Sequence, residues 1–372
     1  MQNPLAKLTA LALLVGTTTL AITACTSDDS SSNGSGNTTP AQDVTYNGPG
    51  SKWDVTFRTA GTFTVTKRAN TTAPVDFTVD GTYTTSTTGF KILTVTSVTG
   101  TGGPSAGDKA WAIDVPRYAL LLSPMESGSD QVIPMVASGS CPTADFAANW
   151  VIVKKSNSSD ATSSSRDFFG SYQYDASTST ATLPSVHALD NAFTNIGANS
   201  LGASTCQDGI AQVSDAVMYL TTNGGAIVHT QVSNPSEASF IFALAQKSIT
   251  NVANFDGAYA GMVFDGNFSA GARLIPAGMT CTSGTCSGHL LSGAETGATA
   301  SDPWTLALTN TVDSPSAGLI TGTLTDNGSA NTGNVACMID TDVLDTSKKI
   351  MSCVGQSPGD NTQMVNAIFA SK

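Results

Sequence analysis

The sequence contains few basic residues, few histidines and almost no glutamate. Of 372 residues, 16 are Lys or Arg and 28 are Asp or Glu, which gives a net charge of −12. A protein that binds nucleic acid through its phosphates needs a basic face, so this composition argues against a nucleic-acid partner. Three of the 28 acids are glutamates (Glu126, Glu237 and Glu295), and the others are aspartates. Aspartate favours turns over helices, so a β-rich protein is expected.

The apolar run near the start of the chain is too short to cross a bilayer, which takes roughly 20 apolar residues. Residues 8–22 are mostly apolar, follow Lys7 and lead into Ile22-Thr23-Ala24-Cys25. A charged start, a short apolar region and small residues before a cut are typical of a secretory signal. The pattern resembles the signal peptide and lipobox of bacterial lipoproteins. That resemblance implies cleavage after residue 24 and a lipid, diacylglycerol with palmitate-type acyl chains, on the sulfur of Cys25. An ordinary signal peptide, with Cys25 in a disulfide, is the alternative.

The resemblance also implies a location and a partner. A lipidated Cys25 anchors the protein to a membrane of the bacterial cell envelope. Thr26, rather than an aspartate, follows the cysteine, which in enteric-type sorting implies the outer membrane. The periplasmic face and the cell surface both stay open, although Ser27-Asp28-Asp29 is similar to the acidic export signal of some surface lipoproteins. Residues 25–43 are rich in Ser, Gly, Asn and Thr, a composition that predicts a flexible tether.

Six cysteines remain once Cys25 is set aside, and an exported protein with an even number of cysteines is expected to form disulfides. Cys281 and Cys286 enclose a turn sequence, and Cys337 and Cys353 flank two short apolar segments around a polar loop. Pairing the cysteines in sequence order places one disulfide in each of these two hairpins and leaves Cys141 to pair with Cys206. Zinc is the rival interpretation, but Cys281 and Cys286 have no second ligand pair nearby.

Period-two alternation of apolar and polar residues recurs along most of the chain, as in Trp53, Val55 and Phe57. Such alternation predicts antiparallel strands with one buried face. We therefore expect an all-β protein with two antiparallel sandwich-like or barrel-like domains, residues 44–249 and residues 254–372, joined near 250–254. The second contains about eight expected strands, which suits a small barrel or sandwich.

Two segments of the first domain, residues 143–148 and 186–196, are candidates for short helices. Three Gly-x-Tyr segments, at Gly81, Gly170 and Gly257, raise the alternative that the chain contains repeats. The Gly257-Ala258-Tyr259 opening is loosely similar to lipocalin-like barrels, and the rest of that family's pattern is missing.

The chain offers no convincing catalytic set. Gly103-Pro104-Ser105-Ala106-Gly107 matches the nucleophile string of α/β-hydrolases, but that mechanism needs a helix after the serine, and a strand is expected there. The three histidines, His187, His229 and His289, have no spacing that supports a triad with Ser105. A hydrolase is therefore kept only as an alternative, and catalytic residues are not assigned.

The candidate metal ligands are Asp340, Asp342 and Asp345, whose closely spaced carboxylates suit Ca²⁺. The loop lacks the glycine and the terminal glutamate of an EF-hand, so solvated turn acids are the favoured interpretation, and no cofactor is assigned. The four tryptophans, Trp53, Trp111, Trp150 and Trp304, are expected in the core rather than on a sugar-binding platform.

These observations favour a lipid-anchored envelope protein that binds, interacts or has a structural role, without catalysis. Its protein or small-molecule partner is not indicated by any motif. The first alternative is a carrier whose barrel of residues 254–372 holds a small apolar ligand. A continuous apolar cavity inside that barrel would favour the carrier, and a filled interior would exclude it.

Overall fold

The computed structural model describes fourteen segments of the chain: 43–48, 53–69, 73–115, 118–124, 133–154, 169–203, 205–213, 216–221, 226–231, 239–265, 273–292, 299–308, 311–343 and 348–372. The expected signal peptide, the lipid-carrying Cys25 and the tether up to residue 42 lie outside these segments, so they stay predictions. No helix within the described segments is long and apolar enough to cross a membrane.

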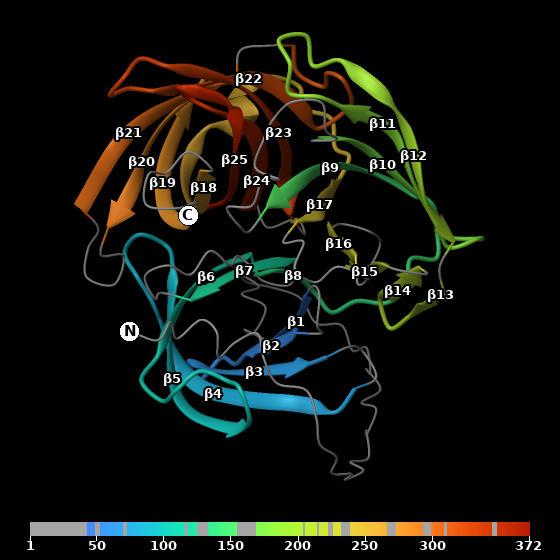
Figure 1. Cartoon of the computed structure of the whole chain (residues 1–372), viewed down its shortest axis with the longest axis vertical. Coiled ribbons are helices and arrows are strands. Elements are labelled where there is room, and N and C mark those ends of the chain that lie inside the picture. Colours follow the sequence, from blue (N-terminus) through green and yellow to red (C-terminus); the bar gives the residue numbers. More distant parts are fainter. Residues whose placement is uncertain are drawn as a thin grey trace, which may run out of the picture.

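The first eight strands form a closed antiparallel barrel (Figure 1). They are β1 (Val44–Gly48), β2 (Trp53–Phe57), β3 (Thr62–Arg68), β4 (Val75–Thr85), β5 (Lys91–Gly100), β6 (Lys109–Val115), β7 (Ala119–Pro124) and β8 (Ile133–Ala137). Pairing of β1 with β8, with Tyr46 opposite Ala137, closes the barrel. Val55 and Phe57 are buried in its interior, and the residue between them, Thr56, points the other way.

The next nine strands form one curved sheet that lies beside both barrels (Figure 1). They are β9 (Phe146–Lys154), β10 (Phe169–Asp175), β11 (Thr180–His187), β12 (Asn195–Ala203), β13 (Thr205–Gln207), β14 (Ile210–Val213), β15 (Ala216–Leu220), β16 (Ala226–Gln231) and β17 (Ser239–Ala245). The chain runs outward from β9 to one edge at β12, continues from the other edge at β13, and returns to pair β17 with β9.

A second closed antiparallel barrel follows a one-turn 3₁₀-helix, η4 (Val252–Phe255) (Figure 1). Its strands are β18 (Gly257–Asp265), β19 (Arg273–Thr282), β20 (Thr285–Ser292), β21 (Thr299–Ala307), β22 (Leu319–Asp326), β23 (Thr332–Val343), β24 (Lys348–Ser357) and β25 (Asp360–Ser371). Pairing of β18 with β25 closes it. We call this unit the C-terminal barrel.

Apolar side chains on the outside of each sheet meet in one core shared by all three. Val115 comes from the first barrel, Phe242 from the nine-stranded sheet and Ile368 from the C-terminal barrel. Because burial of apolar surface removes it from water, this shared core holds the three sheets together. The all-β, antiparallel fold expected from the sequence is confirmed, and residues 44–249 contain two of the sheets.

The two expected short helices are wrong. Within residues 143–148, strand β9 begins at Phe146, and within 186–196 strand β11 runs to His187. The Asp190 carboxylate then organises a turn, because its Oδ1 accepts from the backbone N–H groups of Ala192 and Thr194 at 3.1 and 2.8 Å. Short apolar runs fit a helix or a strand equally well, so periodicity alone does not separate them.

Candidate functional site

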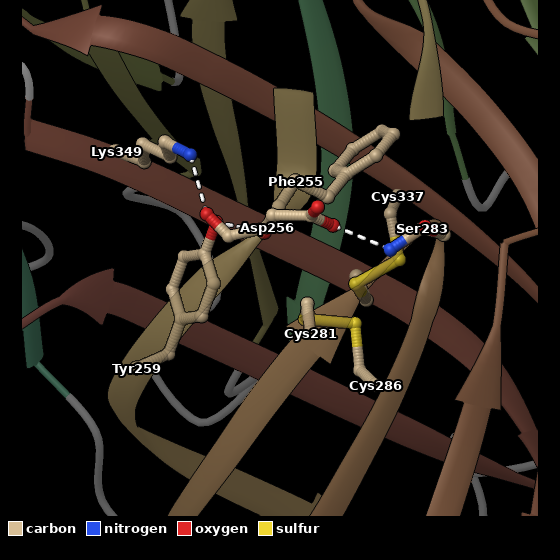
Figure 2. Close-up of a disulfide and its surroundings, with 9 residues drawn as sticks. Phe255, Asp256, Tyr259, Cys281, Ser283, Cys286, Cys337 and Lys349 are labelled. Carbon is tan, nitrogen blue, oxygen red and sulfur yellow. Dashed lines mark hydrogen bonds between the residues drawn. A yellow bond between two sulfur atoms is a disulfide. The ribbon is translucent and has the colours of Figure 1, made fainter. Parts of the chain in front are cut away.

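The helix η4 and the turn after it cover one end of the C-terminal barrel (Figure 2). The hydroxyl of Tyr259 donates to the carbonyl of Phe255 at 2.7 Å, and the backbone N–H of Ser283 donates to Asp256 Oδ1 at 2.6 Å. Lys349 Nζ adds a hydrogen bond of 2.6 Å to the carbonyl of Asp256. Phe255 is completely buried, so it fills this end of the barrel, which is therefore closed.

Two disulfides lie side by side inside the barrel, close to the closed end (Figure 2). Cys281 faces Cys286 across β19 and β20, and Cys337 faces Cys353 across β23 and β24. All four are buried in the interior core. The third disulfide joins Cys141, ahead of β9, to Cys206 on β13. The structure thus forms the three pairs that the sequence predicts, and the two hairpin pairs are part of the interior core of the barrel.

Two inward-facing glycines lie beneath aromatic rings that come from the neighbouring strands. The indole of Trp304 on β21 lies over Gly288 on β20, where a Cβ would come within 2.1 Å of the ring. The ring of Phe369 on β25 lies over Gly261 on β18 in the same way, with a Cβ at 2.0 Å. The two rings are 6.0 Å apart between centroids. Both rings thus lie over glycines of the wall, and both line the cavity of the barrel.

A cavity of about 350 Å³ lies inside the barrel beyond the disulfides, toward the end where β21 begins and β22 ends. This volume lies in the range of small-molecule sites, roughly 300–1,000 Å³. Most of its lining is apolar, and Gly355 adds a position without a side chain. The apolar lining consists chiefly of Val263, Leu290, Trp304, Leu306, Leu324, Val335, Val365 and Phe369.

The rim of the cavity carries two aspartates. Asp302 and Pro303 precede Trp304 on β21, and Asp326 ends β22 directly opposite Trp304. Asp326 accepts hydrogen bonds from Ser329 Oγ at 2.7 Å and from the N–H of Gly328 at 2.9 Å. These hydrogen bonds, with the one from Ser329 the larger influence, lower the pKa of Asp326 below its ordinary value. Asp326 therefore keeps its negative charge at neutral and mildly acidic pH.

The predicted metal ligands are not brought together among the described residues. Asp340 on β23 is completely buried, where its carboxylate accepts from the Tyr118 hydroxyl at 2.9 Å and from Lys247 Nζ at 2.8 Å. The side chain of Asp342 and the whole of Asp345 lie outside the described segments. Within those segments no group of three acidic, histidine or cysteine side chains is placed to hold a metal ion. Asp340 thus joins three sheets through an ion pair and a hydrogen bond.

The hydrolase-like serine lies in an exposed hairpin loop between β5 and β6. The backbone N–H of Ser105 donates to Asp108 Oδ2 at 2.7 Å, and the N–H of Asp108 donates to the carbonyl of Ser105 at 3.1 Å. A strand, β6, follows this loop, so the strand–turn–helix elbow of the hydrolases is not formed.

The histidines lie elsewhere in the structure. His187 Nδ1 is 2.9 Å from the carbonyl oxygen of Phe193, and His289 is on β20 in the C-terminal barrel. His229 is on β16, where the structure describes the backbone but not the side chain. The contacts of Ser105 in the described residues thus form a turn.

The cavity was not assigned from the sequence, although a small apolar site in this barrel was one of the alternatives. Trp304 was expected in the core; it packs against the interior core of the barrel and also forms part of the cavity wall. The signal that could have indicated this is the row of glycines, Gly261, Gly288 and Gly355, at positions where the alternation calls for inward-facing side chains.

Comparison with known proteins gives no match to a family model, and none to a curated protein sequence. Among solved structures, transferrin binding protein B of serogroup B Neisseria meningitidis is similar with 9% identity and a TM-score of 0.28, over 87% of this chain and 65% of that one. The same protein from Haemophilus parasuis gives 10% identity and a TM-score of 0.29, over 87% and 66%.

A DUF3598-family protein of unknown function from Nostoc punctiforme gives 8% identity and a TM-score of 0.18, over 78% of this chain and 91% of that one. The chain thus spans about two thirds of the transferrin binding proteins it matches. These TM-scores are too low for the three structures to bear on function, which is argued below from the residues of the chain itself.

Proposed function

We propose that this protein is a lipid-anchored binding protein of the bacterial cell envelope, and that its C-terminal barrel holds a small apolar ligand. The observation that carries the binding role is the cavity of about 350 Å³ with its mostly apolar wall, closed at one end by η4 and the two disulfides. The anchoring role is supported by the lipobox-like sequence that ends at Cys25. The protein acts by binding rather than by catalysis.

The cavity suits a ligand that is held mainly by burial of apolar surface. Burying about 200–300 Å² of apolar ligand surface contributes about 5–8 kcal/mol at about 25 cal/mol per Å². Before the cost of association, this corresponds to a Kd between about 100 μM and about 1 μM. The wall offers few polar groups, so shape and apolar contact, rather than a network of hydrogen bonds, select the ligand body.

Occupation of the cavity is tested with the uncharged dye N-phenyl-1-naphthylamine, whose fluorescence rises in apolar surroundings. The full chain carrying Cys25→Ser is used, so that no anchor or detergent competes for the dye. We expect a Kd in the micromolar range. Ala367, which lines the cavity, is replaced by phenylalanine to fill it, and this variant should bind at least tenfold more weakly.

The matched control for this experiment is Thr323→Phe, which adds the same ring at an exposed position on β22. Thr323→Phe should bind the dye as the parent chain does. Circular dichroism checks that both variants are folded. Equal dye binding by the parent chain and by a folded Ala367→Phe variant would place the dye elsewhere and would contradict the proposal.

Anchoring is tested separately by mass spectrometry of the protein purified from membranes. We expect the first residue to be Cys25, with the added mass of a diacylglycerol and any further acyl chain. Residues 25–372 with Cys25→Ser, exported behind an ordinary secretory signal peptide, should appear in the soluble fraction, because stable anchoring takes two or more acyl chains at about 0.8 kcal/mol per buried methylene. An unmodified Cys25, or membrane association unchanged by the substitution, would exclude the lipid anchor.

A further inference from the structure

We infer that the ligand of the C-terminal barrel is an apolar amine, with an alkyl or aryl body in the cavity and a positively charged head at the rim. This inference rests on the proposed function, because it names the class of ligand for the same cavity. The rim supplies negative charge from Asp302 and Asp326, and the cavity wall supplies apolar contact. Among the lining residues whose side chains the structure describes, none is Lys, Arg or His.

The two carboxylates belong to neighbouring segments that are fixed to each other. Asp326 is the cross-strand partner of Trp304, and Asp302 precedes Trp304 by two residues. The backbone N–H of Asn327 donates to the carbonyl of Pro303 at 3.1 Å, and Thr305 Oγ1 hydrogen-bonds to the side chain of Asn327 at 3.1 Å. The start of β21 and the end of β22 therefore hold both acids at the same part of the rim.

An indole ring beside two carboxylates is a favourable place for an ammonium group. A cation is attracted by the face of a tryptophan and by each negative charge. One face of the Trp304 ring is covered by Gly288, and the side chain also lines the cavity. An ammonium group at the rim would remain in contact with water while its apolar body is buried, so it would not bear the full cost of desolvation. A carboxylate at the same place would be repelled by both acids.

Asp326 is charged at physiological pH and can therefore attract a cation. Hydrogen bonds from Ser329 and Gly328 lower the pKa of Asp326, so its carboxylate is charged well below neutral pH. An alkyl amine, with a pKa close to that of lysine at about 10.4, is a cation at pH 7.

The experiment compares three competitors of equal chain length, decylamine, decanol and decanoate, in displacing N-phenyl-1-naphthylamine from the full chain with Cys25→Ser. We expect decylamine to displace the dye at a concentration about tenfold lower than decanoate does, with decanol between them, as expected for two charges near a partly solvated head group. The double variant Asp302→Asn/Asp326→Asn should bring the three competitors to within about threefold of one another.

The matched control is Asp208→Asn/Asp175→Asn, which lowers the net negative charge equally but away from the cavity. Asp208 and Asp302 both have a positive φ, of 53° and 46°, a conformation that asparagine tolerates. Asp175 resembles Asp326 in accepting from a serine hydroxyl and a backbone N–H of its own turn. This control should keep the tenfold preference. Loss of the preference in the control would assign it to overall charge and overturn the inference.

The outcomes separate this inference from the proposed function. If the dye does not bind, or if none of the three competitors displaces it, the cavity does not bind apolar ligands and the proposed function fails as well. If decanol displaces the dye while decylamine is no better than decanoate, the cavity binds apolar ligands and only the inference of a cationic head is overturned. A preference for decylamine that disappears in Asp302→Asn/Asp326→Asn alone supports both.

Discussion

Replacing Gly288 by alanine is expected to abolish ligand binding in the C-terminal barrel and to lower the free energy of unfolding by about 2–3 kcal/mol. The new Cβ would lie 2.1, 2.3 and 2.4 Å from three carbons of the Trp304 indole. Real Cβ atoms do not approach ring carbons so closely, so the ring must leave the wall. The cavity is the open space next to the ring, and the displaced indole would occupy it.

Gly278→Ala is the matched control for this change. Gly278 is in the same barrel on β19, and a Cβ there would be 3.4 Å from Nε2 of His289, an ordinary contact. We expect Gly278→Ala to bind the dye normally and to shift the free energy of unfolding only slightly. Dye titration measures binding, and urea denaturation followed by tryptophan fluorescence measures stability. A folded Gly288→Ala variant that binds the dye as tightly as the parent chain would show that the Gly288–Trp304 contact does not shape the site.

The fold could be predicted as far as local patterns extend. Alternation of apolar and polar residues identified the strands, as in Trp53, Val55 and Phe57, because one side of each strand faces a core. The hairpins at Cys281–Cys286 and Cys337–Cys353 could be predicted because a disulfide between adjacent strands needs only a turn between its cysteines. Cys141 and Cys206 then followed by elimination.

The arrangement of the strands could not be predicted in the same way. β17 pairs with β9, although the strands between them lead the chain to both edges of the nine-stranded sheet. Nothing in the alternation of either strand specifies its neighbour. The separation of residues 44–249 into a barrel and a curved sheet depends on such pairings, and so it becomes visible only in the structure.

The candidate site, like the fold, was predictable only where it depends on residues that are close in the sequence. A barrel or sandwich in residues 254–372 was expected. Whether the interior of such a barrel is filled depends on how far its inward-facing side chains reach, and the order of residues along the chain does not give this. Trp304 would occupy the middle of the barrel if Gly288 had a side chain. Asp340 was interpreted as a turn acid or a metal ligand, because closely spaced aspartates follow it in what was expected to be a loop, but it lies on β23. Here it is covered by two other sheets.

The coverage of Asp340 leads to the second large effect. Asp340→Ala is expected to lower the free energy of unfolding by about 2–3 kcal/mol, because it removes the ion pair with Lys247 and the hydrogen bond from Tyr118. The loss is smaller than for a fully buried ion pair, since the side chain of Lys247 is 42% exposed and can be hydrated in the variant. Tyr118→Phe removes one hydrogen bond and should cost about 1 kcal/mol.

The position of Asp340 implies more than a loss of stability. Asp340 is on the C-terminal barrel, Tyr118 precedes β7 of the first barrel and Lys247 follows β17 of the nine-stranded sheet. We therefore expect the contact to couple the unfolding of the three sheets. In Asp340→Ala we expect hydrogen exchange to show the sheets opening at different denaturant concentrations, where the parent chain shows a single transition.

Asp114 provides the matched control because its surroundings contain the same chemical groups within a single sheet. Its carboxylate accepts from the hydroxyl of Tyr46 and forms an ion pair with Lys91 at 3.4 Å, and all three residues belong to the first barrel. Asp114→Ala should destabilise the protein while keeping one cooperative transition, since no contact between sheets is removed. If Asp340→Ala also unfolds in a single transition, the shared apolar core alone couples the sheets. The sheets would then be coupled by burial of apolar surface, and the Tyr118–Asp340–Lys247 contact would only fix their relative orientation.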